Sequence, residues 1–91
     1  MTNEDILLAI SQERQHQITK WGIQNHPLIY WLGILMEEVG EAAKDIIEDN
    51  SAEAITKEMV QVAAVAVACI DLIQRNEMKN GLEMPKLLAS Q

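Results

Sequence analysis

The sequence is poor in the residues that cross-link or interrupt a chain. Its 91 residues include no phenylalanine, two prolines, four glycines and a single cysteine, Cys69. A lone cysteine cannot form a disulfide within the chain, which excludes the small disulfide-stapled secreted scaffolds. Cys69 lies inside an apolar run, so we interpret it as inert core packing.

Positive charge is also scarce. Seven Lys and Arg residues stand against fourteen Asp and Glu residues, for a net charge of −7. Proteins that bind nucleic-acid polymers need clustered positive charge, so we expect no such partner. A nucleotide substrate remains compatible with this composition, because a bound metal ion can carry the counter-charge.

Long hydrophobic runs are missing as well. The longest apolar run, Val62 to Ile70, has nine residues, whereas a membrane-spanning helix needs about 20. The segment Met1 to Asp5 is acidic and lacks the positively charged start of a signal peptide. We therefore expect a cytoplasmic protein with no membrane partner.

The main positive feature of the sequence is a helical spacing of its apolar residues. Thr2 or Asn3 can cap a first helix, and apolar patterns predict further helices over about 28–49 and 52–76. The second of these carries a packing seam spaced by three and four residues: Leu28, Leu32, Leu35, Val39, Ala42 and Ile46. A short helix after Pro85 completes the prediction of an all-α helical bundle, with residues 1–91 forming a single domain.

A chain of this length buries only a modest core, so we expect oligomerisation to complete it. The third predicted helix is apolar on all sides, which is typical of a helix buried on all sides. Val60, Ala64 and Val67 lie opposite the face that carries Glu58. We expect a second subunit to pack there, in a homodimer or homotetramer.

Carboxylates concentrate in Glu37-Glu38-Val39-Gly40-Glu41, within the second predicted helix. Glu38 and Glu41 are three residues apart and share one helix face, where like charges repel. A divalent cation reverses the sign of that interaction, and Mg²⁺ prefers carboxylates together with substrate phosphates. The stripe continues through Trp31 and Ile34, which a purely solvated face would not need. Glu37, Glu41 and Lys44 nevertheless also fit an ordinary solvated face, so this helix alone does not establish a pocket.

A second polar pair, Glu58 and Gln61, has the same spacing on the third predicted helix. If these two helices form an antiparallel hairpin about Asn50, Glu41 and Glu58 stand nine and eight residues from the turn. Four oxygen-bearing side chains would then meet between the helices, as in the metal sites of helical bundles.

These residues resemble the motif of the MazG-like family of all-α nucleoside triphosphate pyrophosphohydrolases, which is Glu-Glu-x-x-Glu followed by Glu-x-x-Asp. The resemblance covers about residues 28–73, and the preceding Lys20-Trp21-Gly22 and His26-Pro27 also look like the family's lead-in. It implies hydrolysis of an NTP or dNTP between the α and β phosphates, giving a monophosphate and pyrophosphate. It also implies Mg²⁺ as cofactor, with Mn²⁺ as an alternative.

Carried over by position, the resemblance assigns roles to individual residues. The implied metal ligands are Glu38, Glu41, Glu58 and Gln61, and Glu37 is the implied catalytic residue that orders a metal ion or the attacking water. Our candidates for contacts to the base are Trp21, His26 and Trp31. The candidates for contacts to the phosphates are Lys20, Lys44 and Lys57, although the sequence favours a solvated side chain for each of them.

Gln61 departs from the family pattern, because a neutral amide replaces the usual Asp. Asp45, one turn beyond Glu41, is a candidate to supply the missing charge. The alternative hypothesis is a non-catalytic MazG-like oligomer that binds nucleotides or a protein partner. A purely structural helical oligomer and a phosphoribosyl-ATP pyrophosphohydrolase, from the same superfamily, are further alternatives.

Overall fold

The computed structural model of the chain describes residues 1–22 and 26–79, with side chains up to residue 76. These residues form three helices and no strand: α1 (Asn3–Trp21), α2 (Leu28–Ile47) and α3 (Ala52–Lys79). The predicted all-α class is confirmed for this part of the chain. The predicted short helix after Pro85 lies outside the described residues.

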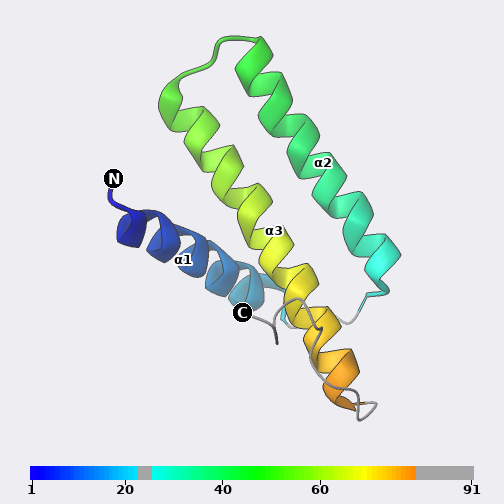
Figure 1. Cartoon of the computed structure of the whole chain (residues 1–91). Helices are drawn as coiled ribbons and strands as arrows, with labels where there is room; N and C mark the ends of the chain where they lie inside the picture. Colours follow the sequence, from blue (N-terminus) through cyan, green and yellow to red (C-terminus); the bar gives the residue numbers. More distant parts are fainter. Residues whose placement is uncertain (23–25, 80–91) are drawn as a thin grey trace, which may run out of the picture.

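Helix α3 organises the arrangement, because both other helices pack against it. Figure 1 shows α2 and α3 running antiparallel as a hairpin, with α1 along the other side of α3. None of the helices in the described ranges combines the length and the apolar character needed to cross a membrane.

The start of α1 carries the predicted cap. The Thr2 hydroxyl accepts a hydrogen bond from the Asp5 backbone N–H at 3.1 Å, and the Thr2 backbone N–H donates to the Asp5 carboxylate at 2.9 Å. This reciprocal pair satisfies two N–H groups that the helix leaves unpaired. The helix ends at Gly22, whose φ of 75° lies in the left-handed region that favours glycine.

Substituting Thr2 with alanine should destabilise the fold by about 0.5–2 kcal/mol, because the cap hydroxyl is lost. Chemical denaturation followed by circular dichroism measures this change in the free energy of unfolding. Thr56→Ala, at an exposed position inside α3, is the matched control and should leave stability unchanged or raised. Equal losses in both variants would show that the cap contributes nothing.

The turn between α2 and α3 is held by two side-chain hydrogen bonds. The Asn50 side-chain amide donates to the Asp45 carboxylate at 2.7 Å, so it faces back toward α2. The Ser51 hydroxyl accepts from the Ala54 backbone N–H at 3.1 Å and caps α3 instead. Asp49, at φ 55°, provides the left-handed residue that closes the hairpin.

The core lies mainly between α2 and α3. Its buried members are Trp31, Val65, Ala68 and Leu72, with Ile34, Leu35 and Cys69 packed around them. Cys69 is half-buried, and burial raises the pKa of its thiol. The thiol is therefore mostly protonated at neutral pH, as expected for a packing residue.

The predicted seam of α2 is only partly inside this core. Ala42 is buried and Leu35 half-buried, whereas Leu28, Leu32 and Val39 are exposed. The face turned toward α3 instead includes Trp31, Ile34 and Glu38. The apolar stripe on α2 is wider than one partner helix can cover, so periodicity alone did not identify the covered part.

The face of α3 assigned to a second subunit is partly covered within the chain. Ala64 is fully buried within the single chain, so a second subunit is not required to cover this residue. Val67 remains 41% exposed and lines a groove with Leu7 and Ile10 of α1. Helix α1, whose apolar pattern is broken, therefore packs on the surface that we expected another copy to occupy.

Candidate metal and nucleotide site

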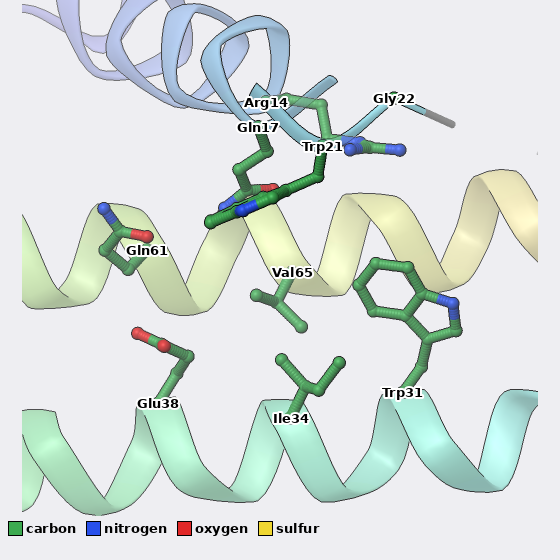
Figure 2. A pocket seen from close by; sticks show the side chains of 9 residues that line it. All are labelled: Arg14, Gln17, Trp21, Gly22, Trp31, Ile34, Glu38, Gln61 and Val65. Carbon is green, nitrogen blue, oxygen red and sulfur yellow. The ribbon is translucent and has the colours of Figure 1, made fainter. Parts of the chain in front are cut away.

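A pocket of about 240 Å³ opens where the three helices meet (Figure 2). Its lining comes from Arg14, Gln17 and Trp21 of α1 with the adjoining Gly22, from Trp31, Ile34 and Glu38 of α2, and from Gln61 and Val65 of α3. Trp31, Ile34 and Glu38 of the predicted stripe thus line a cavity, whereas Glu41 does not.

Glu38 and Gln61 lie across the pocket from each other. Both residues are half-buried, and Figure 2 shows the Glu38 carboxylate directed from α2 toward α3, with the Gln61 side chain above it in this view, on α3. Glu38 and Gln61 lie at similar distances along the chain from the α2–α3 turn. Antiparallel pairing of the helices therefore brings these two predicted ligands together.

Negative charge surrounds Glu38. Burial raises the pKa of its carboxyl group, and the charges of Glu58, Glu37 and Glu41 raise it further. A smaller effect comes from Glu13 of α1, which the sequence did not lead us to include. The site therefore has an excess of negative charge that a cation would neutralise.

This charge excess predicts how stability depends on pH in metal-free buffer. A raised pKa means that the folded state binds the Glu38 proton more tightly than the unfolded state. Stability should therefore fall as the pH rises from the ordinary value of 4.5 through the raised pKa. Glu38→Gln should melt higher than wild type at pH 8, and the gap should close near pH 4.

Melting curves of wild type, Glu38→Gln and Glu48→Gln between pH 4 and 8 check this prediction. Glu48 is exposed at the end of α2 and outside the pocket, so its variant should show no such pH-dependent gap. A Glu38→Gln curve parallel to wild type at every pH would contradict the predicted charge crowding.

The other predicted acidic residues act on Glu38 through their charges but do not line the pocket. Glu58 is half-buried, and Glu37 and Glu41 are exposed. Within the described side chains, no three His, Cys, Asp or Glu residues converge as a group that could hold a metal ion. The fit to Mg²⁺ rests on the donors themselves, which are carboxylate and amide oxygens, the ligand types that hard cations prefer.

Asp45 does not join these residues. Its carboxylate accepts the hydrogen bond from Asn50 at the α2–α3 turn, and it does not line the pocket. We therefore do not retain it as the source of the charge that Gln61 lacks.

Two of the three predicted base contacts line the pocket. Trp31 is 7% exposed, and its indole Nε1 is enclosed without a hydrogen-bond partner among the described residues. Trp21 is 57% exposed and covers the pocket from α1 (Figure 2). His26 lies outside the lining, with its ring centroid 4.2 Å from that of Tyr30 and 6.0 Å from that of Trp31.

The three predicted phosphate lysines all lie outside the lining. The Lys20 ammonium stands 5.0 Å from the centroid of the Trp21 ring. Lys44 and Lys57 are exposed on α2 and α3. Lys44 and Lys57 are therefore better described as solvated lysines than as phosphate contacts. Lys20 lies close to Trp21, which lines the pocket.

Sequence reasoning missed the contribution of α1. Arg14 and Gln17 line the pocket together with Trp21. Their spacing of three and then four residues places all three on one helix face. Trp21 was already a candidate for contact with the base, so this spacing was the signal that could have identified Arg14 and Gln17.

The chain matches no family model, no curated protein and no solved structure.

Proposed function

We propose that the protein is a Mg²⁺-dependent pyrophosphohydrolase that converts an NTP or dNTP into the monophosphate and pyrophosphate. The observation that carries the proposal is Glu38, a carboxylate crowded by other carboxylates at the edge of a pocket that also has two tryptophans. The MazG-like motif suggests the reaction, and nucleotide pool house-cleaning or regulation is the role that we assign to it.

In this proposal Glu38, Glu41 and Glu58 hold the cation through their carboxylates, and Gln61 adds a neutral amide oxygen. When bound, Mg²⁺ neutralises phosphate charge and helps to orient the nucleophilic water. Glu37, one residue before Glu38, would accept a hydrogen bond from that water. The water oxygen would form a bond to the α phosphorus as the bond from that phosphorus to the bridging oxygen breaks, so that pyrophosphate leaves with the bridging oxygen and the water's proton passes to solvent.

The rest of the pocket suits the nucleoside part of the substrate. Trp21 and Trp31 offer flat surfaces for stacking on a base, which is worth about 1–3 kcal/mol per base in single-stranded nucleic-acid complexes. Arg14 is the one positively charged side chain among the described lining residues. The volume of about 240 Å³ is slightly below the roughly 300–1,000 Å³ of whole-ligand sites, so we place the phosphates at the open, acidic edge.

A turnover screen tests the proposal. The purified protein is incubated with Mg²⁺ and each common NTP and dNTP, and pyrophosphate and monophosphate are both quantified. We expect equal amounts of the two products from at least one nucleotide, and no turnover once EDTA removes the metal. Release of inorganic phosphate with a diphosphate product, or no turnover of any nucleotide, would reject the proposed reaction.

A second candidate function is favoured by Gln61, whose amide supplies no charge where the MazG-like pattern has Asp. In that case the protein is a non-catalytic helical oligomer that binds a nucleotide or a protein. Nucleotide binding in calorimetry without turnover would support this candidate. Turnover of phosphoribosyl-ATP alone would instead identify the related hydrolase activity.

We also propose that the protein works in the cytoplasm as a homodimer or homotetramer. The exposed apolar stripe of Leu28, Leu32, Val39 and Ile46 supports assembly, because such a surface on α2 is costly to leave in water. Light scattering coupled to gel filtration gives the mass that decides between a monomer and the two assemblies.

A further inference from the structure

Gln17 of α1 is the one buried polar residue among those that the structure describes. It is 8% exposed, although most residues of α1 are exposed. It lines the pocket together with Trp21, and Figure 2 shows its side chain extending from α1 toward α3. Position 17 therefore directs a polar group into the cavity at the contact between α1 and α3.

This amide has no hydrogen-bond partner among the described residues. By contrast, the exposed Gln15 donates to the Thr19 hydroxyl at 3.5 Å on the same helix. A glutamine amide carries two donors and one acceptor oxygen. Leaving such a group unpaired in a folded protein is costly, and an apolar residue would pack there without that cost.

Water in the pocket can satisfy the amide in the free protein. A ligand that displaces this water must replace its hydrogen bonds or lose affinity. A phosphate group offers acceptors alone and would leave the amide oxygen unpaired. The edge of a nucleobase places donors and acceptors side by side, so it can satisfy both ends of the amide.

We infer that Gln17 is a specificity-determining residue whose amide pairs with the edge of the substrate's nucleobase. The inference rests on the proposed function, because it needs a nucleotide in the pocket. Trp21 and Trp31 line the same cavity and supply aromatic surface beside the base, whereas Gln17 supplies the polar group for its edge. Arg14, which has donors and no acceptor, cannot provide the same complementarity.

The test compares Gln17→Met with the matched control Gln15→Met. Methionine keeps the length and loses both donors and acceptor, and Gln15 is exposed outside the pocket. For each common NTP and dNTP, kcat/KM and the Kd with Mg²⁺ are measured. We expect the ratio between preferred and poor bases to fall roughly 10- to 100-fold in Gln17→Met, with its Tm unchanged or raised, and to stay unchanged in Gln15→Met.

The outcomes separate this inference from the proposed reaction. An active Gln17→Met with the base preference of wild type overturns the role of Gln17 and leaves hydrolysis standing. Base-selective binding without turnover in wild type, lost in Gln17→Met, supports the role and rejects hydrolysis. A wild type that binds no nucleotide, or binds all bases equally, overturns the inference.

A second variant keeps the test decisive if Gln17→Met does not fold. Gln17→Glu retains two acceptor oxygens and loses the donors, so it should reduce affinity for bases that need a donor from the protein. An unchanged order of base preference in Gln17→Glu would overturn the inference in the same way.

Discussion

Replacing Glu38 with glutamine should reduce pyrophosphate release by at least about 100-fold, because metal-ion stabilisation of a phosphoryl transition state is worth several kcal/mol. Glu38 is the carboxylate that both lines the pocket and faces α3. Glutamine keeps the shape of the side chain and removes the charge, so the loss reports cation binding and not packing. A product-release assay at saturating Mg²⁺ measures the effect.

The same variant should gain stability in metal-free buffer, since the charge crowding around Glu38 is removed. A loss of activity together with a gain in Tm separates a functional role from simple unfolding. Glu48→Gln, far from the pocket at the end of α2, should keep wild-type activity. Wild-type turnover in Glu38→Gln would contradict its assignment as a cation ligand.

Substituting Gln61 with aspartate should tighten Mg²⁺ binding roughly tenfold or more, because a second carboxylate would then line the same pocket as Glu38. Calorimetric titration of Mg²⁺ into the two proteins measures the change. The same substitution should lower Tm in the absence of metal, since the added carboxylate repels Glu38. Added Mg²⁺ should then restore stability by mass action.

Gln74→Asp on the same helix is the matched control, because Gln74 is half-buried and lies outside the pocket. It should leave Mg²⁺ affinity unchanged. Unchanged or weaker binding in Gln61→Asp would show that position 61 is not a ligand. The departure from the MazG-like motif would then have no bearing on the metal.

Much of the fold follows from local signals in the sequence. The Thr2 cap and the apolar periodicity of α2 and α3 act within a few residues, so they could be predicted without tertiary information. The opposition of Glu38 and Gln61 also follows from the chain itself. Once the two helices form a hairpin about a short turn, residues at equal distances from the turn stand at the same height, and the helical phase of Glu38 and Gln61 brings both to one pocket.

The place of α1 could not be predicted in this way. Its apolar positions are broken by polar residues, so its pattern identified no partner. Packing against α3 nevertheless buries Ala64 and leaves Gln17 at the pocket. The half of the site that comes from α1, including Arg14, depends on this tertiary contact and had no counterpart in the MazG-like motif.

The exposed apolar stripe of α2 also could not be assigned a partner from the sequence. Leu28, Leu32 and Val39 follow a regular helical spacing, yet they remain exposed in the single chain. Periodicity reveals that a surface is apolar, but the element that covers it is decided by the competition among all available surfaces. For this stripe we propose a second copy of the chain.

The most direct measurement is a Mn²⁺ titration of the isotopically labelled protein followed by NMR. Paramagnetic Mn²⁺ broadens the signals of nuclei near its binding site. At substoichiometric Mn²⁺ we predict selective broadening at Glu38, Glu41, Glu58 and Gln61, reversed by excess Mg²⁺ and absent in Glu38→Gln. Uniform broadening over the acidic surface, or broadening confined to the α2–α3 turn around Asp49, would contradict a cation site between these two helices.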